Sequence, residues 1–195
     1  MYSQFYEETF ILKAVEKCEG SRFLDVGAFH PTDKSNTRAL YEAGWSGVMI
    51  EPSPVPMRNL LAAYGNDKRI ELIEAAVTLE PGLVKLHVTD DAITTSSEAE
   101  FETWKEAGGY IGSMHVPGIT LEQIANQFGG FDFISLDAEG TSVDLFIKAI
   151  IIGWEPKCWC VEHNSRQVEV MRSAETRGYH CVHLNSTNMV LLRTW

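Results

Sequence analysis

The segment from Phe23 to Pro54 most constrains what this chain can fold into. It contains a short apolar stretch that ends in a glycine, a helix-forming stretch and a second apolar stretch that ends in an acid, Glu51. A glycine turn after one buried strand and an acid after the next, about 20 residues on, are typical of nucleotide-binding α/β sheets. The segment therefore predicts one half of such a sheet.

The loop after the first expected strand, Arg22 to Val26, lacks the glycines of a dinucleotide site. Positions 27–31 read Gly-Ala-Phe-His-Pro, so the second glycine of G-x-G-x-x-G, which lets a pyrophosphate approach the helix start, is missing. Gly27 still allows a sharp turn and leaves room for a ligand against the backbone. Glu51 can accept hydrogen bonds from both hydroxyls of a ribose. The pattern favours a nucleoside ligand without a pyrophosphate, such as S-adenosylmethionine, over NAD.

Apolar stretches and helical patterns alternate through the rest of the chain, which predicts an open α/β sandwich. Besides the first two strands, at 22–26 and 47–50, we expect strands at 70–77, 83–88, 131–136, 157–162, 179–184 and 189–193, and helices at 3–18, 35–43, 54–63, 120–128, 142–152 and 165–177. The strand at 83–88 is expected to form a hairpin with the preceding strand and to extend the sheet edge. Residues 89–118 show weak periodicity and are expected to form a substrate-side loop or lid.

Several short motifs occur in the order of a known family. They are D-V-G-A at 25–28, H-P at 30–31, S-N-T at 35–37, G-W at 44–45, I-E-P-S-P at 50–54, T-L at 120–121, D-F-I-S-L-D-A-E-G at 132–140, V-E-H-N at 161–164 and G-Y at 178–179. Over about residues 21 to 193 the chain resembles the FkbM-type branch of the S-adenosylmethionine-dependent methyltransferases. The resemblance implies a Rossmann-like, doubly wound, mostly parallel seven-stranded sheet with a C-terminal antiparallel hairpin. The strand at 83–88 would be an extra strand after the third.

Length and composition indicate one domain over residues 1–195, with the first 20 residues forming a helix that caps the sheet. The chain has 195 residues, of which 45% are hydrophobic, enough for a single buried core. Its formal charge of −11 argues against nonspecific nucleic-acid binding, which needs a surplus of Lys and Arg. No apolar run approaches the roughly 18 residues of a membrane span, and the first residues do not resemble a signal peptide. We therefore expect a cytoplasmic protein; the oligomeric state stays open.

The candidate cofactor residues lie at or just beyond the carboxyl ends of the first three strands, because ligands of open α/β sheets bind there. Asp25 and Gly27 are expected to hold the methionine part of the cofactor and Glu51 the ribose. Ala76, with Ala75, could form a small wall against adenine, although ordinary core packing is an alternative. The full set is Asp25, Gly27, Ala28, Glu51, Pro52, Ser53 and Ala76.

The candidate catalytic residues are Asp137, Glu139, His163 and His30. Methyl transfer needs an acceptor oxygen held in line with the methyl group and a base to take its proton, and a histidine near neutral pKa suits that role. His163, after the fifth strand, is slightly favoured over His30. The resemblance places the D-x-E-G motif from Asp137 in the active cleft, where Asp137 could orient the acceptor and Glu139 could act as base. Helix capping is the structural alternative for both acids.

A divalent metal is conceivable but is not predicted. Asp137, Glu139, Glu162 and His163 supply oxygen and imidazole ligands of the right kind, yet their spacing matches no metal motif. The resemblance implies a methyltransferase that modifies a hydroxyl on a sugar, a glycan or another small molecule. Two alternatives stay open: an NAD-dependent oxidoreductase on a related sheet, and a nucleoside-binding module without turnover.

Overall fold

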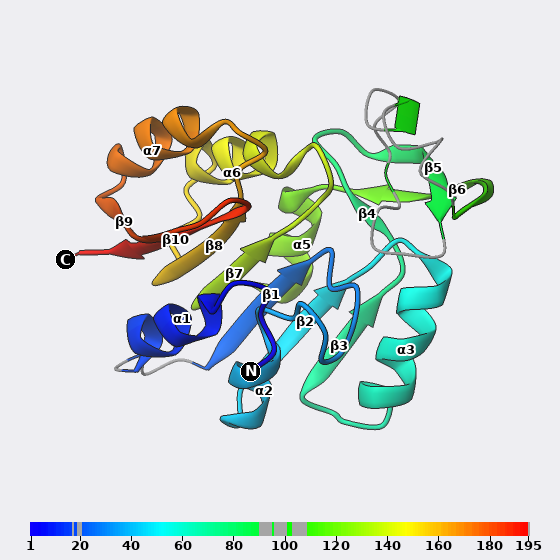
Figure 1. Ribbon diagram of the computed structural model, residues 1–195, viewed down its shortest axis with the longest axis horizontal. Coiled ribbons are helices and arrows are strands. Elements are labelled where there is room, and N and C mark those ends of the chain that lie inside the picture. Colours follow the sequence, from blue (N-terminus) through cyan, green and yellow to red (C-terminus); the bar gives the residue numbers. More distant parts are fainter. Residues whose placement is uncertain (17, 19–20, 90–94, 96–100, 103–108, 195) are drawn as a thin grey trace.

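A seven-stranded sheet forms the centre of the molecule (Figure 1). The computed structural model describes all residues except 17, 19–20, 90–94, 96–100, 103–108 and 195. The sheet order is β3-β2-β1-β7-β8-β10-β9. The strands are β1 (Arg22–Val26), β2 (Ser46–Ile50), β3 (Ile70–Ile73), β7 (Phe133–Leu136), β8 (Cys158–Glu162), β9 (Tyr179–Leu184) and β10 (Asn188–Arg193). Neighbours are parallel except that β10 runs antiparallel to both β8 and β9. The predicted Rossmann-like sheet with its C-terminal hairpin is confirmed.

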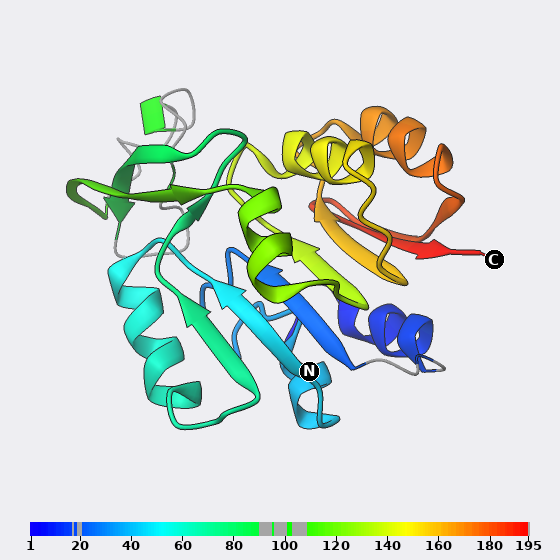
Figure 2. The ribbon, with the colours of Figure 1, turned by 180° about the vertical axis from the view of Figure 1, so that it is seen from behind.

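Helices cover both faces of this sheet. The helices are α1 (Glu7–Val15), α2 (Arg38–Glu42), α3 (Pro54–Tyr64), α5 (Leu121–Phe128), α6 (Ser142–Ile151) and α7 (Gln167–Glu175). Buried residues of the first three share one core cluster with one face of the sheet, and those of the last three share a second cluster with the other face. In Figure 1, α1 and α2 lie in front of the sheet, and in Figure 2, seen from behind, α5 does. No helix in the described residues is both long and apolar enough to cross a membrane.

Alternation along β1 shows how the sequence divides side chains between the two cores. Phe23 packs with the cluster on the α1 side, whereas Leu24 and Val26 pack with the cluster on the α5 side. Successive side chains of a strand point to opposite faces. Asp25 therefore lies on the same face as Phe23, toward α2.

The segment that contains α5 shows how local sequence sets a helix start. The hydroxyl of Thr120 accepts a hydrogen bond from the Gln123 N–H, and the Gln123 side chain accepts one from the Thr120 N–H. This reciprocal capping box satisfies two of the N–H groups that a helix start leaves unpaired. Leu121 and Ile124 bury the apolar face of the helix against the sheet.

A second, three-stranded sheet corrects the predicted sheet edge. It consists of β4 (Ala76–Val77), β6 (Tyr110–Ile119) and β5 (Gly82–Thr89), in that order. The single strand expected at 70–77 is thus divided, since β3 stays in the main sheet while β4 pairs with β6. The predicted hairpin between 83–88 and the preceding strand is wrong, because β5 pairs antiparallel with β6.

The same sheet corrects part of the expected loop at 89–118. Residues 110–118 belong to β6 and are not loop. Residues 90–94, 96–100 and 103–108 lie outside the described residues. The substrate-side role of this region stays a prediction.

Candidate functional site

A cavity of about 560 Å³ opens at the carboxyl ends of the parallel strands. It lies where ligands of open α/β sheets bind. Because β10 is antiparallel, it contributes its first residue and the residue before it. The lining residues are Gln4, Val26, Gly27, Phe29, Lys34, Asn36, Ile50, Glu51, Pro52, Ser53, Pro56, Ala75, Ala76, Val77, Leu86, Asp137, Ala138, Glu139, Thr141, Glu162, Thr187 and Asn188.

Glu51 ties together the loops after β1 and β2. One carboxylate oxygen accepts the N–H of Phe29 at 2.9 Å and the other accepts the N–H of Ser53 at 2.7 Å. Burial raises the pKa of Glu51, while these hydrogen bonds act in the opposite direction. A carboxylate has about four acceptor positions, so Glu51 can still accept two hydroxyl donors. The predicted candidates Glu51, Pro52 and Ser53 all line the cavity.

Gly27 is required where the β1 loop meets the end of β7. Its φ of +77° is a conformation that glycine adopts freely, and a Cβ there would lie 1.8 Å from the carbonyl oxygen of Asp137. The N–H of Asp137 donates to the carbonyl of Val26 at 3.0 Å and holds the two loops together. Gly27 lines the cavity and leaves space there for a ligand. Its close contact with the β7 loop is a second reason why this position requires a glycine.

Two predicted cofactor residues, Asp25 and Ala28, do not appear among the lining residues. Ala28 packs in the core on the α1 side. The Asp25 carboxylate accepts a hydrogen bond from the Thr37 hydroxyl at 2.5 Å. Burial raises the pKa of Asp25 to about 6, and the charge of Glu51 adds to the increase. Because side chains alternate between the two faces along β1, Asp25 points toward α2. Its carboxylate therefore does not line the cavity.

Three acids gather at the other end of the cavity: Asp137, Glu139 and Glu162. Leu136 and Val161 are partners in the parallel β7–β8 pair. The residues that come next, Asp137 and Glu162, therefore lie side by side at the strand ends. Loss of hydration, together with the charges of Glu162, Glu139 and Asp25, raises the pKa of Asp137 well above its ordinary value. Asp137 therefore holds a proton more readily than a free aspartate.

Ser142 links the two sides of this acidic end. Its hydroxyl donates to Glu162 at 3.2 Å and accepts the N–H of Ala138 at 2.8 Å. The serine is fully buried at the first position of α6. It thereby positions the Asp137–Glu139 loop relative to the end of β8.

Neither predicted histidine is among the cavity-lining residues. His163 is 2% exposed; its Nδ1 accepts the N–H of Ser165 at 3.1 Å, and its Nε2 lies 3.1 Å from the carbonyl of Asn185. With Nδ1 accepting, Nε2 carries the hydrogen that donates to Asn185. Both ring nitrogens are therefore committed to the backbone.

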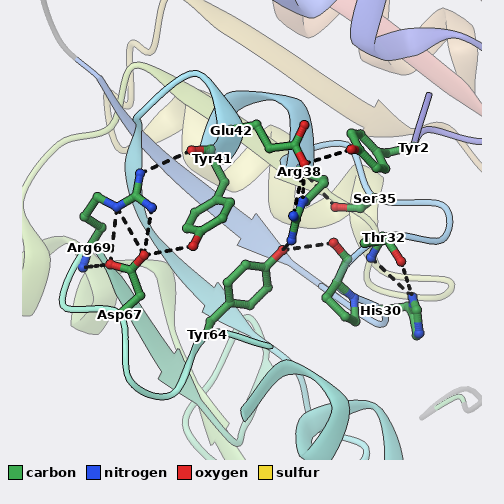
Figure 3. Close-up of polar contacts among 11 residues, drawn as sticks. Tyr2, His30, Thr32, Ser35, Arg38, Tyr41, Glu42, Tyr64, Asp67 and Arg69 are labelled. Carbon is green, nitrogen blue, oxygen red and sulfur yellow. Dashed lines mark hydrogen bonds and ion pairs between the residues drawn. The ribbon is translucent and has the colours of Figure 1, made fainter. Parts of the chain in front are cut away.

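His30 belongs to the loop between β1 and α2, and hydrogen bonds hold this loop in place. Its Nδ1 accepts N–H groups of Thr32 at 3.2 Å and Asp33 at 2.9 Å. The hydroxyl of Tyr64 donates to the next carbonyl, Pro31, and Arg38 donates to that hydroxyl (Figure 3). These contacts fix the loop with His30 beside Thr32.

Several lining residues were not predicted, and two of them carry a backbone signature. Phe29 and Lys34 have φ values of +45° and +57°, which are rare for residues with a Cβ. Such strain persists where the surroundings enforce it, and it often accompanies functional sites. Asn188 could have been found from the sequence by noting that an antiparallel strand presents its first residue at this edge. Within the described residues, no three His, Cys, Asp or Glu side chains are arranged to hold a metal ion.

Two solved structures with a similar fold are described as methyltransferases and are distant in sequence. A protein from Staphylococcus aureus assigned as a caffeoyl-CoA O-methyltransferase is 11% identical with a TM-score of 0.51, covering 100% of this chain and 86% of its own. One from Klebsiella pneumoniae assigned as an O-methyltransferase is 13% identical with a TM-score of 0.50, covering 98% of this chain and 81% of its own. At these identities the likeness shows the fold alone. Among curated proteins, none matches this sequence significantly.

The sequence itself gives a closer assignment. The model of the methyltransferase FkbM domain matches residues 25–180, which is most of the chain. The match includes the β1 loop, Glu51 and the three acids of the cavity. It confirms the resemblance found from the short motifs. The chain belongs to the FkbM-type family of S-adenosylmethionine-dependent methyltransferases.

Proposed function

We propose that this protein transfers a methyl group from S-adenosylmethionine to a hydroxyl of a sugar, a glycan or another small molecule. The observation that carries the proposal is the cavity with Glu51 at one end and Asp137, Glu139 and Glu162 at the other. The first end is suited to a nucleoside and the second to an acceptor hydroxyl. The FkbM-type family membership supports the transfer chemistry.

The residues around Glu51 fit an adenosine. Glu51 retains acceptor capacity for two ribose hydroxyls beyond its two backbone bonds. Ala75, Ala76 and Leu86 line the neighbouring part of the cavity and offer an apolar surface for a purine. No glycine-rich pyrophosphate loop follows β1, which favours this ligand over NAD. When bound, S-adenosylmethionine supplies an electrophilic methyl group on a sulfonium.

The acids at the other end would position and deprotonate the acceptor. Alignment of the reacting atoms contributes most of the rate in such transfers, and a base contributes further. Burial and the neighbouring acids raise the pKa of Asp137, so its ionised form takes up a hydroxyl proton more readily than an ordinary aspartate does. Glu139 lines the same end and is the second candidate for that role. Because His163 and His30 are engaged elsewhere, we propose no catalytic role for them.

Calorimetric titration with S-adenosylhomocysteine, with NAD in parallel, tests the cofactor. Micromolar binding of S-adenosylhomocysteine alone is expected. Binding of NAD alone would favour an oxidoreductase, and binding of neither would overturn the proposal.

Transfer of a labelled methyl group to a panel of sugars and glycans tests the acceptor class. Product that carries an O-methyl group is expected. Cofactor binding without transfer to any member of the panel would favour a nucleoside-binding module. The Asp137→Asn variant is expected to bind S-adenosylhomocysteine and to lose transfer.

A further inference from the structure

Asn188 has an unused hydrogen-bond acceptor at the edge of the cavity. The residue lines the cavity and is 4% exposed. Its Nδ2 donates to Glu7 at 2.8 Å, whereas its Oδ1 is buried without a hydrogen-bond partner in the described part of the chain. A buried acceptor left unpaired destabilises the folded protein, because it has lost its hydration and gained no partner. An unpaired amide oxygen at the edge of a cavity points to a bound ligand that donates the missing hydrogen bond.

Glu7 fixes which way this amide is turned. The Glu7 carboxylate is fully buried and accepts from Phe5 N–H at 2.7 Å and from Asn185 Nδ2 at 2.8 Å, besides Asn188. Burial acts to raise the pKa of Glu7, but these hydrogen bonds outweigh it and the pKa is lowered, so the group is charged. A carboxylate only accepts hydrogen bonds. The amide of Asn188 must therefore turn its NH₂ toward Glu7 and its oxygen away.

Strand register places Asn188 in a row with two of the cavity acids. Asn188 is the direct partner of Glu162 in the antiparallel β8–β10 pair, and Asp137 lies at the end of the next strand, β7 (Figure 1). From β2, which carries Glu51, to β10 there are four strand intervals, about 19 Å at the usual spacing of ~4.8 Å. A cofactor whose ribose lies at Glu51 leaves this end of the cavity for a second molecule.

The ionisable side chains at this end of the cavity are acids. Asp137, Glu139 and Glu162 are acids, and among the described lining residues Lys34, from the β1 loop, is the single basic one. A protonated amine has three donors and no acceptor, which matches a wall of carboxylate and amide oxygens. A carboxylate or phosphate on the ligand would face like charges.

We propose that the β8–β10 end of the cavity is the acceptor subsite and that it selects acceptors with a protonated amine, whose hydrogens Glu162 and the Asn188 Oδ1 receive. This inference rests on the proposed function and narrows its substrate class to hydroxyl compounds that also carry an amine. Glu7 is a positioning residue that orients Asn188. Anionic sugars are excluded from the subsite.

Three probes that differ at one substituent test the inference: D-glucosamine, D-glucose and D-glucuronate. Their binding is measured by ligand-observed NMR at a pH where the amine is protonated, with and without saturating S-adenosylhomocysteine. Glucosamine is expected to bind about tenfold more tightly than glucose, as for a charge-assisted hydrogen bond, and glucuronate is expected not to bind. Equal binding of glucosamine and glucose would overturn the inference.

Two variants locate the binding. Asn188→Leu removes the amide oxygen, and Glu162→Gln removes the charge but keeps an oxygen for Ser142. Both are expected to reduce glucosamine binding to the level of glucose while binding of S-adenosylhomocysteine stays unchanged. The matched control is Asn164→Ala: the Asn164 Oδ1 is also buried without a hydrogen-bond partner in the described part of the chain, but Asn164 does not line the cavity. This variant should keep the preference for the amine.

The outcomes separate the two proposals. If the wild type binds S-adenosylhomocysteine but shows no preference for glucosamine over glucose, the amine subsite alone is overturned. Absence of S-adenosylhomocysteine binding would overturn the proposed function, and the titrations without it would still decide the amine preference. If Glu162→Gln binds glucosamine as tightly as the wild type, the subsite is wrong whatever the fate of Asn188→Leu.

Discussion

Glu51 and Asp137 both follow sheet strands and line one cavity, but their surroundings are opposite. Glu51 faces backbone N–H groups, which stabilise its charge and hold its position. Asp137 is buried beside other acids, and both its burial and their charges favour its protonated form. The strands β2 and β7 that carry them are separated by β1 alone. One sheet edge thus provides a carboxylate suited to hold a ligand and another suited to exchange a proton.

The contact that joins these two regions is expected to be the most sensitive point. In Gly27→Ala, the new Cβ would meet the Asp137 carbonyl at 1.8 Å in a backbone conformation that alanine avoids. We expect a loss of at least about 4 kcal/mol in the free energy of unfolding, measured by urea denaturation, because the backbone must shift. Gly44→Ala is the control: Gly44 has φ +94° with open space around it, so about 1 to 2 kcal/mol is expected. Equal losses would show that the interloop contact is unimportant.

Asp25, on the strand between the two regions, tests whether they share an electrostatic environment. Its folded-state pKa of about 6 lies above the ordinary value of 3.8, so the folded chain binds the proton more tightly in that window. The free energy of unfolding therefore falls as the pH rises from about 4 to 6, by about 3 kcal/mol, and stays lower above it. Asp25→Asn keeps an oxygen for Thr37 and should remove this fall.

Urea denaturation of both proteins below, within and above the window measures that difference. Because other groups also titrate, the comparison is between the two pH profiles and not their absolute values. Parallel profiles would contradict the raised pKa of Asp25.

Glu51→Gln tests the ligand-holding side. The variant places an NH₂ group against one backbone N–H and removes the charge that would bind the ribose hydroxyls. We expect S-adenosylhomocysteine to bind more weakly by about 1.5 to 3 kcal/mol, the value of hydrogen bonds to a charged group, as measured by calorimetry. Glu71→Gln, an exposed glutamate on β3, should bind as the wild type does. Unchanged affinity in Glu51→Gln would remove the ribose assignment.

Ser142→Ala tests the proton-holding side with the smallest expected effect. The change deletes the donor to Glu162 and the acceptor for the Ala138 N–H. We expect the free energy of unfolding to fall by about 1 to 2 kcal/mol, as for buried groups left unpaired. Ser142→Thr keeps the hydroxyl and is the control. No change in Ser142→Ala would show that the two strand ends are positioned by packing alone.

The sequence predicted the main sheet because its strands are short, apolar and separated by well-formed helices. The prediction failed for strands whose residues do not show the usual strand pattern. Tyr110–Ile119 forms β6 although it contains two glycines and Pro117, which depress strand propensity. The apolar run at 70–77 conceals a change of sheet between Ile73 and Ala76 that no periodicity reveals.

The sequence predicted those site residues that lie at the carboxyl ends of the strands. Glu51, Gly27, Ala76, Asp137 and Glu139 line the cavity because they follow strands of known direction. The same rule placed His30 and His163 near the edge but could not show that backbone groups occupy Nδ1 of His30 and both ring nitrogens of His163. Asn188 was missed because its role depends on an antiparallel strand and on Glu7, far away in the sequence.

The pairing of Glu7 with Asn188 has a consequence for how the molecule is made. These residues are 181 positions apart, and β10, although it follows β9 in the sequence, lies between β8 and β9 in the sheet. Because a domain generally folds as a unit, this pairing can form only after Asn188 has left the ribosome. The Asn188 side closes only when both ends of the chain meet. A chain that has not been synthesised as far as Asn188 would therefore lack a complete acceptor end of the cavity.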